Sequence, residues 1–353
     1  MVYPERIPWD SKTKMSKIKA AVIGLGKSGL TLDLDSARKE IWTHSLAIKE
    51  HKKLDLVAVV DEVGCERDSL KKIGITKKTI FFKDSEQMIK EIDPEFVSIC
   101  TPANTHLDIV KKLNKCSSLK YIYCEKPVGI SAKETKEIIA ICKNRNIILG
   151  TNYMRRWEKK YIDVREKILR KEYGNLLAIN ANGATALYTS ASHLIDLMIY
   201  FSGKVSEVSG KLQTDYIREV HGNEDFGANA FLKFENGATG HLKATSKGPE
   251  FYMFEIDILF EEGRIEIKND GNEIIESKFV NKKSNSGSGF MTLEEVPNKI
   301  TNNERLLSAL TDITNTTHPS LPKSNGENAL EVQKVIQTII ESSNKGGVFK
   351  KIG

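Results

Sequence analysis

The stretch Ala20–Gly29 reads AAVIGLGKSG, an apolar run that leads directly into the pattern G-x-G-x-x-G. In such a pattern the first glycine permits a tight turn, the second lets the backbone approach a pyrophosphate, and the third lets a helix pack closely on the strand. We therefore expect this loop to bind a dinucleotide. The residues predicted to bind it here are Gly24, Gly26, Lys27, Ser28 and Gly29.

An acidic residue follows the next apolar run, as a dinucleotide site requires. Leu54–Val60 reads LDLVAVV and is predicted to be the second strand, and Asp61 comes directly after it. A carboxylate at this position binds the ribose 2′-hydroxyl and repels a 2′-phosphate, so the predicted cofactor is NAD. NADP remains the alternative, because Arg67 lies six residues further on.

The first unit carries extra residues between its glycine loop and its acid. Asp61 lies 32 residues after Gly29, where about 20 are usual, and we place the extra residues in Thr31–Trp42. Either the first helix is interrupted there or a loop is inserted at its start. The segment is an exposed surface loop or it borders the cofactor or substrate. Asp33 and Asp35 should point away from bound phosphates, because like charges repel.

The first part of the chain, as far as Gly150, alternates short apolar strands with helical segments. This alternation is typical of a doubly wound parallel sheet that is covered on both faces, the α/β Rossmann class. The predicted strands are Lys17–Ile23, Leu54–Val60, Thr79–Phe82, Phe96–Cys100, Tyr121–Cys124 and Ile147–Leu149.

After Gly150 strand follows strand with turn signals and without intervening helices, which predicts an α+β domain with an open, largely antiparallel sheet. These strands are Leu176–Ala181, Val205–Gln213, Ala228–Phe234, Gly240–Ala244, Phe251–Phe260 and Arg264–Lys268. We therefore divide the chain into a dinucleotide-binding domain at 15–150 and a substrate-binding and oligomerisation domain at 151–353. Residues 1–14 are polar and are expected to form an N-terminal arm. It is a frayed tail, a stretch that follows from a start codon assigned too early, or an arm that packs on a second subunit.

Composition excludes several classes of protein. The chain has 353 residues, of which 40% are hydrophobic and 28% charged, a mixture typical of globular proteins and unlike disordered or fibrous chains. The formal net charge of +6 is spread over many lysines with acids between them, so nucleic acid is not an expected partner. No apolar run approaches the ~20 residues that a membrane span needs.

The cysteines and the N-terminal sequence indicate the cellular compartment in which the protein is expected. The five cysteines are odd in number and none is spaced C-x-x-C, which argues against both a disulfide framework and a metal site. We expect buried, reduced thiols. With no apolar signal segment at the N-terminus, a cytoplasmic location follows as an expectation.

Two further residues stand where chemistry is expected. Lys126, within Glu125-Lys126-Pro127, follows a predicted strand of the parallel sheet, at the edge where such sheets bind ligands. His193 begins an apolar helix. Taken alone, a lysine before proline is usually a surface residue and a histidine at this point is often a core or capping residue.

Several motifs fall in order along nearly the whole chain and carry a resemblance. They are Val60-Asp61, Cys100-Thr101-Pro102 with Asn104 and His106, Glu125-Lys126-Pro127, Asn152-Tyr153-x-Arg155-Arg156, His193-x-x-Asp196-Leu197 and Ser324-Asn325-Gly326-Glu327. With the glycine loop they make the sequence resemble the glucose-fructose oxidoreductase, inositol dehydrogenase and MocA (Gfo/Idh/MocA) family. The pair T-P-x-x-x-H and E-K-P is far more specific than the glycine loop. The resemblance implies a Rossmann domain followed by an open-sheet α/β domain.

The resemblance also implies roles for residues. Thr101, Pro102, Asn104 and His106 would lie near the nicotinamide or its ribose, and Glu125 and Lys126 would reach the nicotinamide and the reacting hydroxyl. Tyr153, Arg155 and Arg156 would line or brace the substrate site, and His193 would be the general acid/base. Removal of a hydroxyl proton needs a base with a pKa near neutral, and an ammonium stabilises the developing alkoxide.

The sequence departs from the family at two positions. The family often has an aspartate four residues before the histidine and a glycine two before it, where this chain has Thr189 and Ala191. Thr189 is still a predicted substrate-site residue. Asp196 is expected to brace the helix or orient the His193 ring rather than to replace the missing acid, and the proton-transfer role can shift toward Lys126. A Thr43-His44 pair also resembles a family branch associated with surface-polysaccharide and nucleotide-sugar pathways.

The predicted function is an NAD(P)-dependent oxidoreductase that acts on a secondary hydroxyl of a sugar, cyclitol or nucleotide sugar. Two rival interpretations are a non-catalytic protein that senses a dinucleotide or sugar on the same fold, and an enzyme that cleaves a glycosidic bond through transient oxidation. A broad sheet rarely stays uncovered, so we also expect a homodimer or homotetramer.

Overall fold

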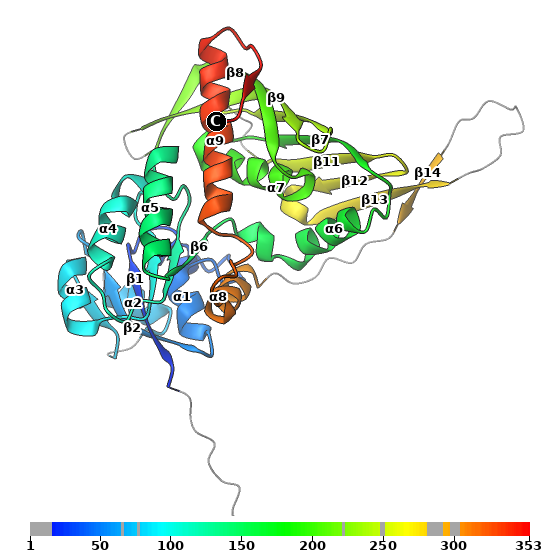
Figure 1. Cartoon of the computed structure of the whole chain (residues 1–353). Coiled ribbons are helices and arrows are strands. Elements are labelled where there is room, and N and C mark those ends of the chain that lie inside the picture. The colour runs from blue at the N-terminus through cyan, green and yellow to red at the C-terminus, as the bar shows by residue number, and fades with distance from the viewer. Residues whose placement is uncertain are drawn as a thin grey trace, which may run out of the picture.

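The computed structural model describes most of the chain as two sheets with helices around and between them (Figure 1). The described residues are 16–64, 67–75, 78–220, 223–247, 251–280, 292–296 and 304–353. The predicted N-terminal arm at 1–14 therefore lies outside the described residues, as does Cys65.

The first sheet is parallel throughout, with strand order β3-β2-β1-β4-β5-β6. Its strands are β1 (Ile18–Ile23), β2 (Leu54–Val60), β3 (Ile80–Phe82), β4 (Phe96–Ile99), β5 (Tyr121–Cys124) and β6 (Ile148–Thr151). This is the doubly wound order of a dinucleotide-binding sheet, and it confirms the predicted Rossmann class.

Each face of this sheet has its own core, because successive side chains of a buried strand point to opposite faces. Ala21 and Ile23 belong to the core that includes residues of α3 (Ser85–Ile92), α4 (His106–Leu113) and α5 (Ala132–Asn144). Ala20 and Val22 belong to the core with α1 (His44–Glu50), α2 (Arg67–Lys72) and α8 (Arg305–Asn315). Thus α8, from late in the chain, completes the cover of the first sheet.

The second sheet has strand order β14-β13-β12-β11-β7-β10-β9-β8-β15, and only the β7–β10 pair is parallel among its described strands. Its bounds are β7 (Leu176–Gly183), β8 (Val205–Val220), β9 (Asn223–Phe234), β10 (Thr239–Ala244), β11 (Phe254–Phe260), β12 (Gly263–Lys268), β13 (Glu273–Val280), β14 (Thr292–Val296) and β15 (Lys350–Lys351). The predicted open, largely antiparallel sheet is confirmed.

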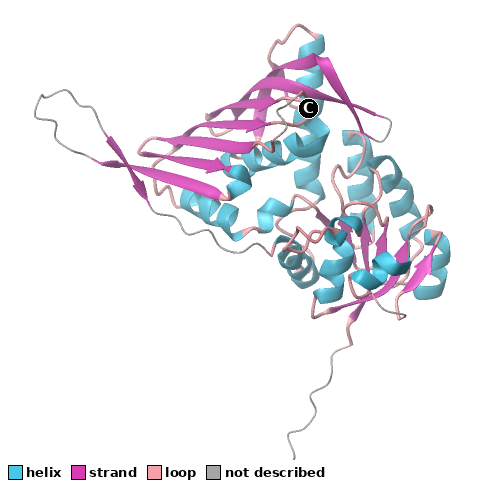
Figure 2. Ribbon diagram, turned by 180° about the vertical axis from the view of Figure 1, so that it is seen from behind, coloured by secondary structure: helices cyan, strands magenta, loops and turns pink. Residues whose placement is uncertain are grey.

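Helices cover one face of this sheet, and none of the described helices lies on the other (Figure 2). The covering helices are α6 (Lys159–Leu169), α7 (Ser192–Ser202) and α9 (Gly326–Asn344). Side chains on β9 alternate between the two faces: Ala230 and Leu232 are buried, whereas Phe231 and Lys233, each one residue further along, are exposed. The uncovered face is therefore part apolar and part charged.

The strands differ from the predicted ones where the apolar pattern fades. β8 continues from Gln213 to Val220 and β9 begins at Asn223 rather than Ala228. Most side chains in the added part of β8 are exposed or half-buried, so no alternation marked it in the sequence. The strands β13 and β14 were not predicted.

Four of the five cysteines, Cys100, Cys116, Cys124 and Cys142, are free and buried, which confirms the expected buried thiols for these four. Among the described residues, no helix is both long and apolar enough to cross a membrane.

Candidate active site

The glycine loop has the geometry that a pyrophosphate needs. A Cβ on Gly29 would lie 1.9 Å from the carbonyl oxygen of Gly24, and one on Gly24 would lie 2.8 Å from the backbone of Thr101. A Cβ on Gly26 would meet nothing within 4 Å. Gly24 and Gly29 therefore let neighbouring backbone segments approach closely, whereas Gly26 leaves open space beside its backbone. The residues present fit a dinucleotide at this loop.

The side chain of Asp61 holds the glycine loop through hydrogen bonds with backbone N–H groups. Its carboxylate accepts the N–H of Leu25, at 2.8 Å, and the N–H groups of Val63 and Gly64 in its own turn. One side chain thus joins the end of β2 to the glycine loop. The predicted contact of Asp61 with a ribose hydroxyl remains a prediction.

The inserted segment starts with a 3₁₀ turn, η1 (Thr31–Leu34), and the first α-helix is delayed until His44. Asp33 accepts the N–H of Trp42, at 2.9 Å, and both the N–H and the hydroxyl of Thr43. Its carboxylate therefore serves the start of α1. The Trp42 ring lies under the guanidinium of Arg305, 4.7 Å from its centroid, which attaches the segment to α8.

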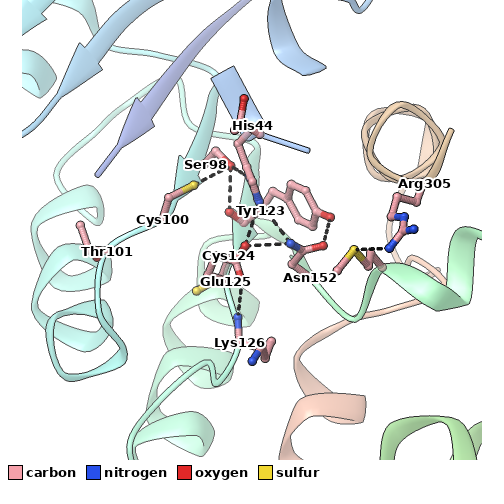
Figure 3. A network of polar contacts seen from close by, with 12 residues as sticks. His44, Ser98, Cys100, Thr101, Tyr123, Cys124, Glu125, Lys126, Asn152 and Arg305 are labelled. Atoms are coloured by element: carbon pink, nitrogen blue, oxygen red, sulfur yellow. Dashed lines mark hydrogen bonds and ion pairs between the residues drawn. The ribbon is translucent and has the colours of Figure 1, made fainter. Parts of the chain in front are cut away.

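Behind the loop lies a buried polar network that joins four elements (Figure 3). The His44 ring contacts Ser98 Oγ through Nδ1, and its Nε2 lies 3.3 Å from Glu125 Oε1. Asn152 donates to the same carboxylate at 2.8 Å and accepts the hydroxyl hydrogen of Tyr123 at 2.6 Å. These partners hold the Glu125 carboxylate in one place beside Lys126.

The charges in this network stabilise each other. Burial lowers the pKa of His44, but the interactions with Cys100 and Glu125 outweigh burial and raise that pKa to about 10. Burial raises the pKa of the Cys100 thiol, and His44 opposes that effect. In turn His44 outweighs the effect of burial on Glu125 and lowers the pKa of that carboxyl to about 2.

The segment Thr101–His106 is held by the His106 ring. Its Nε2 lies 2.8 Å from the carbonyl oxygen of Thr101, and the Cys124 thiol lies 3.4 Å from Nδ1. Burial lowers the pKa of His106, so the neutral ring donates from Nε2 to Thr101. His106 is buried, whereas Asn104 is exposed and Pro102 half-buried. The structure thus places His106 beneath this segment.

Lys126 contacts a π-helical turn, η4 (Leu187–Ala191), of the second domain. Its Nζ donates to the carbonyl oxygens of Thr189, at 2.9 Å, and Tyr188, at 3.4 Å. The N–H groups of the same two residues donate to the buried carboxylate of Asp225 on β9. The hydroxyl of Thr189 turns back to the backbone of Ala186.

His193 lies in the first turn of α7, directly after η4. Its buried ring meets the ring of Tyr153 edge-on, with 5.4 Å between centroids. Burial, together with the positive charges of Arg155 and Lys126, lowers the pKa of His193 well below its usual value. The imidazole is therefore neutral at physiological pH, with a free nitrogen lone pair, and it is a weaker base than an ordinary histidine.

The two arginines of the Tyr153-x-Arg155-Arg156 motif are both buried and paired. Arg155 binds Asp270 through Nε, at 2.6 Å, and Nη2, at 2.8 Å. Arg156 binds Asp196 through Nε at 2.9 Å and thereby ties the motif to α7. Of the two roles expected for Asp196, this pair fits bracing of the helix. Arg155 Nη1 is buried without a hydrogen-bond partner in the part of the chain described.

Comparison with known proteins agrees with this geometry. Residues 18–153 match the model of the GFO_IDH_MocA oxidoreductase family with its NAD-binding Rossmann fold, and residues 164–266 match a GFO/IDH/MocA C-terminal domain. The chain belongs to the Gfo/Idh/MocA family. It is thus a member of a family of NAD-binding oxidoreductases, and the resemblance predicted from its motifs is confirmed.

Relatives within the Gfo/Idh/MocA family are distant. Scyllo-inositol 2-dehydrogenase (NAD(+)) of Bacillus subtilis is 25% identical over 267 residues, covering 70% of this chain and 73% of its own. A crystal structure of the WlbA dehydrogenase from Bordetella pertussis with NADH and UDP-GlcNAcA has a TM-score of 0.74 at 18% identity, covering 96% of this chain and 99% of that one. Levoglucosan dehydrogenase with NADH and L-sorbose also gives 0.74 at 18%, covering 96% and 100%.

The Gfo/Idh/MocA motifs predicted part of this candidate site, but some residues that contact its members escaped the sequence analysis. Asp225 stands in a polar strand with no motif around it, and Arg305 begins a helix far along the chain. His44 was noted only as part of a Thr-His pair. Among the described residues, no group of three His, Cys, Asp or Glu side chains could hold a metal ion.

A pair of glycine variants tests the loop. Gly26→Ala should leave the free energy of unfolding nearly unchanged, since its Cβ meets nothing, but should weaken NAD binding by at least about tenfold because the methyl group occupies space beside the backbone. Gly29→Ala should lose both stability and binding. Thermal unfolding and calorimetric titration with NAD measure the two effects. Equal NAD affinity in Gly26→Ala and the wild type would contradict the assignment.

The buried imidazolium predicts a pH dependence of stability. The pKa of His44 is about 10 in the native state, against its ordinary value of 6.5. The stabilisation from His44 is thus complete below its unfolded pKa and is lost as the pH rises toward the native one. Urea unfolding across this range should show a steeper fall for the wild type than for His44→Gln. The half-buried His241→Gln is the control, and parallel curves for wild type and His44→Gln would refute the charge assignment.

Proposed function

We propose that this protein is an NAD(P)-dependent dehydrogenase or reductase of a secondary hydroxyl or ketone on a sugar, cyclitol or nucleotide sugar. The observation that carries the proposal is the position of Lys126. Lys126 follows the carboxyl end of β5 in the parallel sheet, and its Nζ contacts η4, the turn that leads directly into α7 with His193. One ammonium and one neutral imidazole thus stand on either side of the junction between the two domains.

Each group has a distinct task in such a reaction. Bound nicotinamide would accept or supply the hydride at the carbinol carbon. The Lys126 ammonium gives two of its hydrogens to Tyr188 and Thr189, and its third would bind the substrate oxygen and stabilise the alkoxide charge. The neutral His193 ring would take the hydroxyl proton during oxidation and return it during reduction.

The cofactor proposal is NAD in preference to NADP. Asp61 puts a carboxylate beside the glycine loop, where it repels a 2′-phosphate. The inositol and levoglucosan dehydrogenases among the relatives make a cyclitol or an uncharged sugar the first substrates to try, and the WlbA complex adds UDP-linked sugars. We also propose a cytoplasmic location, which the four buried free thiols favour.

Turnover by variants tests this function. The purified protein is first examined by mass spectrometry for bound NAD(H) or NADP(H), and then assayed for NADH formation with inositols, free sugars and UDP-sugars. Lys126→Ala and His193→Ala should each lower kcat by about 100-fold or more, the usual contribution of proton transfer. Lys143→Ala, an exposed lysine at the end of α5, is the control.

Each alternative has its own outcome in these assays. Wild-type rates in both variants would overturn the assigned roles. Tight binding of a sugar and of NAD without any turnover would favour the sensing protein. Cleavage of a glycoside with no net NADH would favour transient oxidation.

We also propose that a second copy of the chain covers the open face of the second sheet. Phe231 is 58% exposed on that face and packs on His241, with 5.0 Å between ring centroids. An uncovered aromatic group on a broad sheet is typical of an interface. Sedimentation at micromolar concentration should show a dimer or tetramer, and Phe231→Glu should shift it toward monomer. A monomeric wild type would contradict the proposal.

A further inference from the structure

Asp225 is a carboxylate that the motifs of the sequence did not single out. It lies on β9, far from Lys126 in sequence, and only 2% of it is exposed. Its two oxygens accept the N–H groups of Tyr188, at 2.8 Å, and Thr189, at 3.0 Å. Both bonds fix η4, the turn that immediately precedes the His193 helix.

Lys126 reaches the same turn from the other side. The peptide group between Tyr188 and Thr189 donates its N–H to Asp225 and accepts Lys126 Nζ with its carbonyl oxygen. The carbonyl oxygen of the next peptide, that of Thr189, accepts Lys126 at the shorter distance of 2.9 Å. A single peptide group therefore connects the carboxylate with the ammonium, and its dipole points favourably toward both charges.

The effects of neighbouring charges on the pKa values of Lys126 and Asp225 also link these two side chains. Burial lowers the pKa of Lys126, whereas Glu125 and Asp225 raise it and Arg155 lowers it. Burial raises the pKa of Asp225, and its hydrogen bonds with η4 and the charge of Lys126 oppose that effect. His193, which faces the same region, is neutral. Glu125 is already committed to His44 and Asn152.

We propose that Asp225 is a positioning residue for Lys126, and that β9 supplies through η4 the carboxylate that the turn itself lacks at Thr189. It aims two backbone carbonyls at Nζ and helps to keep that group an ammonium. The inference deepens the proposed function and rests on it for the chemical role of Lys126. If Asp225 only held η4 in place, removing its charge would leave the titration of Lys126 unaffected.

A labelling experiment separates the two possibilities and needs no substrate. The full-length protein is exposed to a trace of acetic anhydride at a series of pH values, and mass spectrometry measures acetylation of Lys126. Asp225→Asn keeps the size and one acceptor oxygen but removes the charge. Acetylation of Lys126 near pH 8 should become about tenfold faster, as expected when one nearby opposite charge is lost.

Two controls keep the comparison specific. Asp257→Asn removes an acid on the open face of the second sheet, where it binds Arg264, and it should leave labelling of Lys126 unchanged. Thermal unfolding confirms that each variant is folded. An unchanged pH dependence of Lys126 labelling in folded Asp225→Asn would overturn the proposal, whether or not a substrate has been found.

A second variant keeps the proposal testable if Asp225→Asn does not fold. Thr189→Asp added to Asp225→Asn returns a carboxylate to the turn from within. Wild-type labelling of Lys126 in this folded double variant would support the proposal, because the charge then acts from either position. Labelling that stays faster than in the wild type would overturn it.

Discussion

The carboxylate of Glu125 is the charge around which the junction of the two domains is built. Its side chain is 14% exposed, and a buried charge of this kind is costly unless it is paired and hydrogen-bonded. Three donors meet that need: the ring of His44, the amide of Asn152 and the backbone N–H of Lys126. Because they come from different elements, satisfying one charge determines where those elements lie.

The Glu125 carboxylate is also connected to the glycine loop, through His44 on α1. The N–H of His44 donates to the carbonyl oxygen of Ser28 at 2.9 Å, so the helix that carries the imidazolium also closes the glycine loop. The inserted segment before α1 gives the chain enough length to place His44 there. The Asp33 carboxylate secures the start of that helix through the N–H and hydroxyl of Thr43.

The sequence predicted what depends on local pattern. The parallel sheet, the glycine loop, Lys126 and His193 all belong to short motifs or to apolar runs with a clear period. Asp225 and Arg305 could not be found in this way, because their roles arise from contacts between segments far apart in the chain. The long outer part of β8 also escaped, since its side chains are largely solvent-facing and obey no buried alternation.

The position of α8 bears on how the chain is divided. Leu306, Leu310 and Ile313 lie in the same core as Ala20 and Val22, and a Cβ on Gly150 would collide with Ile313 at 2.4 Å. The first domain is therefore not one continuous stretch of sequence, because α8, from late in the chain, packs into its core. A nucleotide-binding half cut out at Gly150 would expose the part of this sheet face that α8 covers, beside α1 and α2. In this chain the smallest unit able to bury that face includes α8, so the domains are not interchangeable modules.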